Sequence, residues 1–284
     1  STSMKNSVVI VALVGLFASP ILSQIGNSGI RDWDQHLFYF GSVFKTVVQY
    51  RQVPLWNPWY CGGSVLYQNP QVPLLSPVYI LAPLTGLLLA VKITIAIYYG
   101  IALLGMFLLA RIVYGLSNKY LIFLACSVFV FSGSLSLHIA EGQTHMFGAA
   151  FFPFVVLGYE LYLSRKRTGW LLLGGASLAL IIWSGGIYAA PLIALFVIAY
   201  AALRAAIEQS LTPLWGLAVV GVSAFLFSAL RLLPVMDYMR DYPRIVMGRE
   251  FVPPAAWYDI FFGREQSLFT RFTLSDGGFP VGWK

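Results

Sequence analysis

Long apolar runs alternate with short polar stretches along almost the whole chain. A helix of about 20 residues crosses the hydrocarbon core of a bilayer, and most of the runs are near that length. Within the membrane each segment must satisfy its own backbone polar groups, so runs of this kind fold as helices. Seven runs meet the description: 7–25, 93–113, 119–138, 145–163, 170–184, 187–205 and 214–232. The pattern predicts an all-α integral membrane protein with about seven transmembrane helices.

One further apolar run, Leu74–Ala90, is ambiguous because prolines interrupt it. The basic residues of the short connections decide its role, since such residues accumulate on the cytoplasmic side. If the run does not cross, they share one side: Lys5, Arg111, Lys119, Arg165, Lys166, Arg167 and Arg204. If it does cross, Lys5 is separated from the others. We therefore expect a re-entrant or interfacial segment over 74–90 and a cytoplasmic N-terminus.

This topology leaves two long segments on the external face. Residues 1–233 form the transmembrane module, whose first external loop runs over about 26–91, and 234–284 form an external loop or tail. No helix closes the chain after the tail, so we expect it to continue into further helices of a longer protein. The run Val8–Ile25 has features of a signal peptide, because a lysine precedes it and small residues follow. Its length favours a retained first helix.

The composition determines how the charge is interpreted. Hydrophobic residues make up 58% of the chain and charged residues 10%, whereas soluble domains are about a quarter charged. The formal net charge of +7 would indicate nucleic acid in a soluble protein. Here the positive-inside rule accounts for it, and we expect the lipid bilayer as a partner and no nucleic acid. Cys61 lies in a polar loop and Cys126 within a span, so no disulfide is expected.

An amphipathic helix is predicted over residues 33–50 of the external loop. An apolar stripe with helical spacing marks one face: Trp33, Leu37, Phe40, Phe44 and Val47. Polar residues fill the remainder, which is typical of a helix lying in the membrane interface. Asp32 and Gln35 fit an acidic capping box at its start, and Asp34 would favour the positive helix end.

The two aspartates also allow a functional interpretation. They lie near the lipid–water boundary, where an anchored substrate presents its polar head. A carboxylate there can take a proton from a sugar hydroxyl or help to hold a divalent cation. Their i, i+2 spacing puts them on different helix faces, so both cannot serve one ligand. We expect Asp32 to cap the helix and Asp34 to be the catalytic group, with Asp32 assisting.

Residues 53–77 combine aromatic rings, amides and turn-forming residues. Their prolines and glycines exclude a regular helix. Trp56 suits an aromatic belt, and Asn57, Asn69 and Gln71 offer neutral hydrogen-bonding groups. Aromatic faces beside amides are common in carbohydrate sites, and they are equally compatible with an ordinary interfacial loop. These four residues are the candidate substrate-binding residues of the loop.

A short external turn carries His138, Glu141 and His145, whose spacing would align them on one helix face. Such a set could bind a metal. Gly142 argues against an unbroken helix, and a solvated helix cap is the simpler interpretation. Glu141 is expected on the same side as Asp34. Asp34, Glu141 and His145 are therefore the candidate ligands of a divalent cation, Mg²⁺ or Mn²⁺.

Charged residues elsewhere give weaker indications. Arg240 and Arg244 of the tail could hold a lipid phosphate bidentately or form surface ion pairs. Glu160 and Arg231 lie near opposite ends of their spans, where their side chains can snorkel to the interface. The chain has no P-loop, Rossmann glycine pattern, HExxH or GxSxG motif, which argues against nucleotide-driven chemistry.

The stretch VPLWNPWYCGGSVLYQNPQVPLLSPVYIL follows a first span and an acidic external motif. This arrangement resembles the N-terminal half of GT-C-type polytopic glycosyltransferases and is most similar to the bacterial YfhO-like membrane proteins. In that group an aspartate precedes an aromatic-rich helix, and Asp34 followed by FYF at 38–40 matches the spacing. The likeness covers roughly 5–240, but only 30–80 is specific. It implies a seven-helix module in the bacterial cytoplasmic membrane, a polyprenyl-phosphate sugar donor at the external face, and an acid of the first external loop as catalytic base.

Two functions are expected on this basis. The first is a GT-C-type transferase in which Asp34 is the general base, Arg240 or Arg244 holds the donor phosphate, and a divalent cation assists. The second is a non-catalytic integral subunit, a degenerate relative that packs in a larger membrane complex, because helices and a C-terminal domain usual in the group are missing. A flippase or transporter would require polar residues along a mid-membrane path, and the spans lack them.

Overall fold

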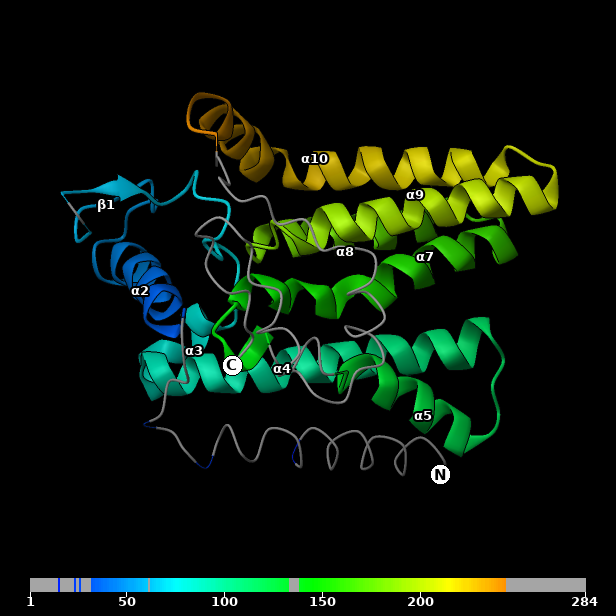
Figure 1. Ribbon diagram of the computed structural model, residues 1–284, viewed down its shortest axis with the longest axis horizontal. Coiled ribbons are helices and arrows are strands. Elements are labelled where there is room, and N and C mark those ends of the chain that lie inside the picture. Colours follow the sequence, from blue (N-terminus) through cyan, green and yellow to red (C-terminus); the bar gives the residue numbers. More distant parts are fainter. Residues whose placement is uncertain are drawn as a thin grey trace, which may run out of the picture. The chain divides into compact units, whose positions relative to one another are not determined.

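The computed structural model describes residues 15, 23, 26, 32–60, 62–132 and 138–243. It divides the chain into two units, Ser1–Arg240 and Asp241–Lys284, and the fold given below is that of the first. The expected first span over 7–25 lies outside the described residues, apart from two isolated positions, as does the tail from residue 244 onward. The described part is mostly helical (Figure 1).

A loop region comes first along the chain, and a series of apolar helices follows it. The described elements are α2 (Trp33–Phe44), η1 (Lys45–Gln49), β1 (Trp56–Asn57), β2 (Ser64–Val65), α3 (Val78–Thr85), α4 (Leu87–Leu108), η2 (Leu109–Val113), α5 (Lys119–Val130), η3 (Thr144–Phe151), α7 (Phe152–Arg165), α8 (Gly169–Trp183), α9 (Ala189–Glu208) and α10 (Thr212–Asp241). Strands β1 and β2 form an antiparallel hairpin that the sequence pattern did not predict.

Four helices are long and apolar enough to cross a membrane: Leu87–Val113, Thr144–Arg165, Ala189–Glu208 and Thr212–Asp241. The expectation of about seven spans is therefore corrected to four among the described residues. Two of the expected spans, α5 and α8, are helices of only 12 and 15 residues. At 1.5 Å per residue each falls short of a hydrocarbon core about 30 Å thick. Helix α8 ends where Gly185 adopts a positive φ of 81°, which stops the helix before α9.

The expected re-entrant segment over 74–90 is not a single element. Gly86, with φ 81° and ψ 160°, breaks it into α3 and the first turn of α4. The backbone turns sharply there because glycine has no Cβ to clash. The span expected at 93 therefore begins at Leu87, and α3 packs against α4 as a separate short helix.

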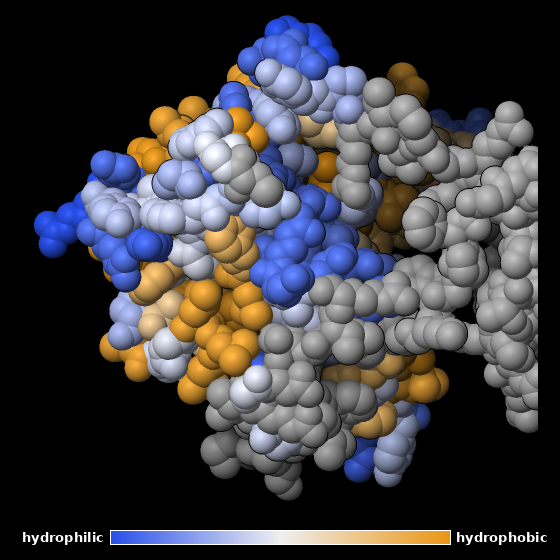
Figure 2. Space-filling model, turned by 60° about the vertical axis from the view of Figure 1, so that its left-hand side comes forward, coloured by the Kyte–Doolittle hydropathy of each residue, from blue (hydrophilic) through white to orange (hydrophobic). Residues whose placement is uncertain are grey.

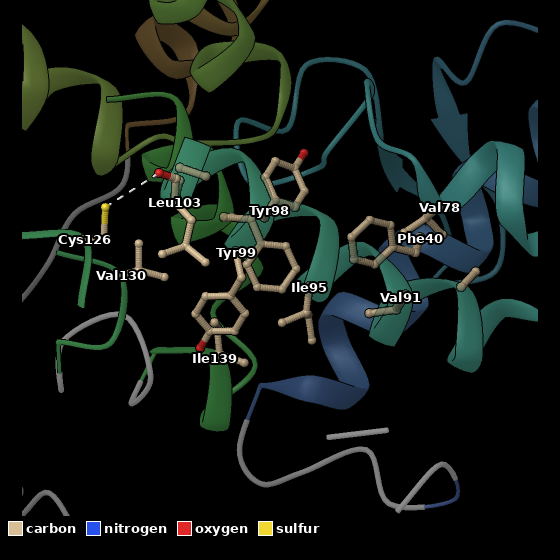
Figure 3. Packing of buried hydrophobic residues seen from close by; sticks show 14 of the residues in the cluster. Phe40, Val78, Val91, Ile95, Tyr98, Tyr99, Leu103, Cys126, Val130 and Ile139 are labelled. Atoms are coloured by element: carbon tan, nitrogen blue, oxygen red, sulfur yellow. Dashed lines mark hydrogen bonds between the residues drawn. The ribbon is translucent and has the colours of Figure 1, made fainter. Parts of the chain in front are cut away.

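Helix α2 begins at Trp33, as the apolar stripe predicted, and η1 continues it to Gln49. Its apolar face packs into the protein: Trp33 and Phe40 belong to one buried cluster with residues of α3, α4 and α5. Figure 3 shows this packing, with Phe40 beside Val78 and Val91. The last stripe residue, Val47, is exposed. Helix α2 is thereby fixed to the membrane helices by its own hydrophobic contacts.

Helices α7, α8 and α10 pack closely where glycine removes the side chain. A Cβ on Gly158 of α7 would lie 2.6 Å from the carbonyl oxygen of Trp170 in α8. One on Gly175 of α8 would lie 1.9 Å from the hydroxyl of Ser223 in α10. Small residues at such crossings let helix backbones approach, as in many membrane bundles.

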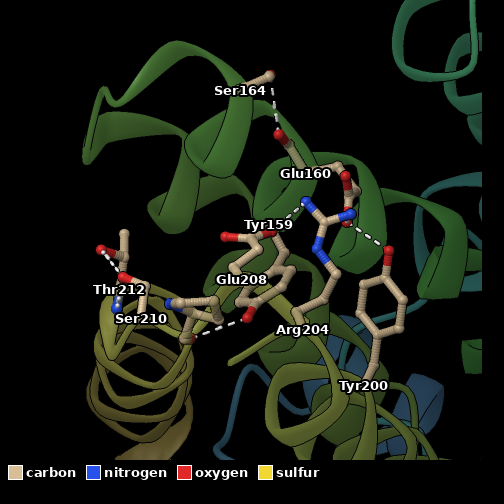
Figure 4. A network of polar contacts seen from close by, with 9 residues as sticks. Tyr159, Glu160, Ser164, Tyr200, Arg204, Glu208, Ser210 and Thr212 are labelled. Carbon is tan, nitrogen blue, oxygen red and sulfur yellow. Dashed lines mark hydrogen bonds and ion pairs between the residues drawn. The ribbon is translucent and has the colours of Figure 1, made fainter. Parts of the chain in front are cut away.

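Glu160 of α7 does not snorkel but lies buried in a polar cluster (Figure 4). Its carboxylate accepts a hydrogen bond of 2.5 Å from the hydroxyl of Tyr200 and lies 3.9 Å from Arg204, both on α9. Arg204 also pairs with Glu208 at 2.7 Å. The cluster joins α7 to α9 near the connection between α9 and α10.

Candidate functional site

The start of α2 docks on the turn that carries Glu141. The backbone N–H of Asp32 donates to the carbonyl of Glu141 at 3.0 Å, and the indole N–H of Trp33 donates to the carbonyl of Ile139 at 3.0 Å. Gly142 permits the approach. Its φ is 81°, and a Cβ there would lie 2.5 Å from the backbone nitrogen of Trp33. Segments more than 100 residues apart therefore meet at the start of α2.

The two aspartates divide their roles differently from the prediction. Asp32 occupies the N-cap position, but its side chain makes no capping hydrogen bond. The side chain of Asp34, inside the first turn, accepts a hydrogen bond from the backbone N–H of Gln35 at 2.8 Å. The amide of Gln35 donates to the hydroxyl of Tyr39 at 2.7 Å rather than closing a capping box. The capping box was therefore a wrong prediction, and Asp34 both helps to start the helix and remains exposed to solvent.

Glu141 is buried at the end of a short chain of polar groups. The side-chain amide of Gln143 donates to its carboxylate at 3.1 Å. The oxygen of that amide lies 2.5 Å from Nδ1 of His138, which places the imidazole hydrogen on Nδ1. The turn thus fixes Glu141 through its own residues.

His36 is the central residue of this region that sequence reasoning missed. It is buried, and its Nδ1 lies 2.7 Å from the hydroxyl of Thr144. Its ring contacts Tyr39 and His145, with centroids 5.7 and 5.8 Å away. Burial lowers the pKa of His36 from 6.5 to about 4, so the ring is neutral at physiological pH. The signal was available in the spacing 33, 36, 40 and 43, which is the buried face of the helix.

His145 is likewise buried, and its ring packs edge-on against Tyr188 at 5.0 Å. Among residues 32–60, 62–132 and 138–243, no group of three or more His, Cys, Asp or Glu side chains is arranged to hold a metal ion. Asp34, Glu141 and His145 therefore do not fit a three-ligand cation site.

The candidate substrate-binding loop uses part of its polar groups internally. The side-chain oxygen of Asn57, which is fully buried, accepts from the backbone N–H of Trp59, and that of Asn69 accepts from Gln71, both at 3.0 Å. Trp56 remains 53% exposed, although Gly63 covers part of its ring: a Cβ on Gly63 would lie 2.2 Å from the indole. Asn69 and Gln71 are half-buried. Trp56, Asn69 and Gln71 keep surface for a ligand, whereas Asn57 is structural.

The arginines of α10 differ in exposure and in their partners. Arg240 is exposed on α10 and pairs with Asp237 at 2.9 Å, while Arg244 lies outside the described residues. Arg231 does not snorkel: it is 1% exposed and donates to the backbone carbonyls of Asn69 and Val72. A buried arginine therefore reaches the candidate substrate-binding loop from the opposite end of the sequence.

A hydrophilic area lies in the middle of one face of the molecule, next to hydrophobic areas (Figure 2). The start of α2 and the turn at 138–144 bring together the exposed carboxylate of Asp34, the buried carboxylate of Glu141 and the neutral imidazole of His36. An exposed carboxylate can accept a proton from a hydroxyl. Half-buried amides and an exposed indole can bind a sugar ring.

Comparison with family models, curated proteins and solved structures gives no match for this chain. The resemblance to GT-C-type enzymes therefore stays a prediction, carried by the stretch over 30–80. The described residues establish a mostly helical integral membrane protein with four candidate spans, in which α2 and the turn at 138–144 form one polar region.

Proposed function

We propose that this protein is a membrane-embedded transferase that moves a sugar from a polyprenyl phosphate at the external membrane face. The observation that carries the proposal is the docking of α2 on the Glu141 turn. It brings the exposed Asp34 and the buried Glu141 into one polar region outside the four candidate spans. A lipid-linked substrate would present its head group at such a position.

Asp34 is the general base in this proposal. It accepts the proton of an acceptor hydroxyl while that oxygen forms a bond to the anomeric carbon of the donor sugar. The bond between the anomeric carbon and the phosphate oxygen breaks, and the polyprenyl phosphate leaves with the electron pair. Trp56, Asn69 and Gln71 bind the sugar, and Arg240 is the remaining described candidate for contact with the donor phosphate.

An Asp34→Asn variant tests the proposal because asparagine can still accept the hydrogen bond from Gln35. The helix start is therefore preserved while the base is lost. Transfer from a short polyprenyl phosphate carrying glucose, mannose or arabinose would be measured with the full chain in nanodiscs. We expect kcat to fall by about 100-fold or more. An Asp32→Asn control should stay within about threefold of the wild type, and an Asp34→Asn enzyme as active as the wild type would rule out the general base.

A second function, a non-catalytic subunit of a membrane complex, is favoured by a different observation. Large apolar side chains lie exposed on η1 and around the hairpin, outside the candidate spans: Val47, Val48, Tyr50, Val53, Leu55, Trp56, Trp59 and Tyr60. Contiguous exposed patches of this kind mark protein interfaces. Under this alternative a Tyr60→Ser variant loses a stoichiometric partner subunit during purification, whereas Asp34→Asn retains it.

A further inference from the structure

The segment Tyr67–Leu75 carries two candidate sugar-binding amides but contains neither helix nor strand. We call it the amide loop. Short local contacts give it a turn: the N–H of Val72 donates to the carbonyl of Asn69 at 3.1 Å, and the N–H of Gln71 donates to the Asn69 side chain at 3.0 Å. Contacts of this range fix a turn but not its place in the protein. Its position must come from the helices around it.

Helix α10 holds the amide loop through Arg231. One guanidinium nitrogen, Nη2, donates to the carbonyls of Asn69 at 2.6 Å and Val72 at 2.8 Å. The guanidinium carbon lies 5.8 Å from the ring centre of Tyr67. The hydroxyl of Tyr67 in turn donates to the carbonyl of Leu230 at 2.9 Å. Arg231 of the helix therefore donates to the loop, and Tyr67 of the loop donates to the neighbouring Leu230 of the helix.

The turn between α8 and α9 holds the other end of the amide loop. The N–H groups of Leu74 and Leu75 both donate to the carbonyl of Trp183, at 3.1 and 3.2 Å. Gly185 allows close contact, since a Cβ there would lie 2.7 Å from the carbonyl oxygen of Gln71. Trp183 is tied to α10 as well, through its indole N–H and the carbonyl of Phe227 at 3.1 Å. The loop thus lies between two anchors that are themselves connected.

The charge of Arg231 needs a reason, because burying a cation is costly unless it is compensated. Among the described residues its side chain has no carboxylate within 4.0 Å, and its hydrogen bonds go to backbone carbonyls. A leucine would pack α10 at no such cost. What a leucine lacks is a charged N–H₂ group that can donate to two carbonyls of one turn.

We propose that Arg231 is a positioning residue that fixes the amide loop, so that Asn69 and Gln71 keep the geometry in which they bind the sugar. The part that concerns sugar binding rests on the proposed function. The part that concerns the loop does not. Arg231 itself is buried and makes no contact with substrate in this scheme.

Hydrogen exchange of the full chain in nanodiscs tests the loop directly. In Arg231→Met we expect the amides of Gln71, Val72, Leu74 and Leu75 to exchange at least about tenfold faster, because two charge-assisted hydrogen bonds are lost. Arg231→Lys keeps a charged donor on a shorter side chain, so it should restore part of the protection. Tyr67→Phe removes only the bond to Leu230 and serves as the milder variant if Arg231→Met fails to fold.

The matched control is Arg240→Met, which removes an exposed arginine of the same helix and should leave loop exchange unchanged. Wild-type exchange of the amide loop in the Arg231 variants, or in Tyr67→Phe if those do not fold, would overturn the inference whatever their activity. In the transfer assay we expect Arg231→Lys to raise KM several-fold with kcat little changed. Faster loop exchange in a protein whose wild type transfers no sugar would refute the proposed function and leave the positioning role standing.

Discussion

His36 shows how much one buried side chain can determine in this protein. Its ring is enclosed by Thr144, Tyr39 and His145, so protonation would place a charge where water cannot solvate it. The same ring joins α2 to η3, since its partners lie on both elements. The attachment of α2 therefore depends on a neutral imidazole.

The pKa of His36 predicts that the folded protein loses stability in acid. Above pH 6.5 the ring is neutral in both the folded and the unfolded chain. Between pH 6.5 and about 4 the unfolded chain binds a proton that the folded one does not, so the free energy of unfolding falls as the pH is lowered. The full loss is roughly 3 kcal/mol. Thermal unfolding in detergent at pH 7 and pH 4.5 measures most of this loss.

A His36→Asn variant is the control for that experiment, because asparagine does not titrate. Other groups contribute to the pH dependence of both proteins, and the difference between them isolates His36. We expect the variant to be less stable at pH 7 and to lose less stability on acidification. If the stability of the two proteins changed with pH by the same amount, His36 would not be the group responsible.

At the scale of elements, glycines decide how closely α7, α8 and α10 pack. Gly158 faces backbone atoms of α8, with the nitrogen of Gly174 only 2.7 Å from the position of a Cβ. Backbone atoms cannot move aside as a flexible side chain can. The α7–α8 pair must therefore separate to admit even a methyl group.

A Gly158→Ala variant should accordingly lower the free energy of unfolding by about 1–3 kcal/mol through overpacking. Gly221→Ala is the matched control, because a Cβ at Gly221 of α10 meets nothing within 4 Å. Alanine there should be neutral or stabilise the helix by up to about 1 kcal/mol. Equal midpoints of thermal unfolding for the two variants would contradict close packing of α7 on α8.

A helix could be predicted from the sequence where its own apolar pattern was sufficient to locate it. The apolar stripe located α2 because its period belongs to the helix alone, although the buried face turned out to include His36. Hydropathy located α8 with its observed length of 15 residues, but it did not reveal that α5 ends at Val130. Whether Asp32 caps the helix with its side chain depends on its rotamer, which spacing does not encode. The contacts of Arg231 link residues about 160 positions apart, beyond any local pattern.

For the molecule as a whole, the distribution of charge predicts its orientation. Figure 1 shows α2, β1 and α3 near one end of α4, and the connections α4–α5, α7–α8 and α9–α10 at the other. The end that holds these three connections carries several basic residues: Arg111, Lys119, Arg165, Lys166, Arg167 and Arg204. By the positive-inside rule we expect this end in the cytoplasm and the end with α2 outside.

Cysteine labelling in intact cells measures that orientation. In a background with Cys61 and Cys126 replaced by alanine, Gln52→Cys should react with a membrane-impermeant maleimide added outside. Arg167→Cys should react only after the membrane is permeabilised. Both positions are exposed, so a failure to react reports the membrane rather than burial. The reverse pattern would place the α2 end in the cytoplasm and exclude an external donor site.

The bond between Arg231 and the amide loop also sets an order of events during synthesis. The donor on α10 lies 162 residues after Asn69, so the loop leaves the ribosome long before its anchor exists. At roughly 5–20 residues per second the wait is about 8 to 32 seconds. During that time the loop has its local turn contacts but not the hydrogen bonds from Arg231. The nascent chain fixes the amide loop only when its last described helix arrives.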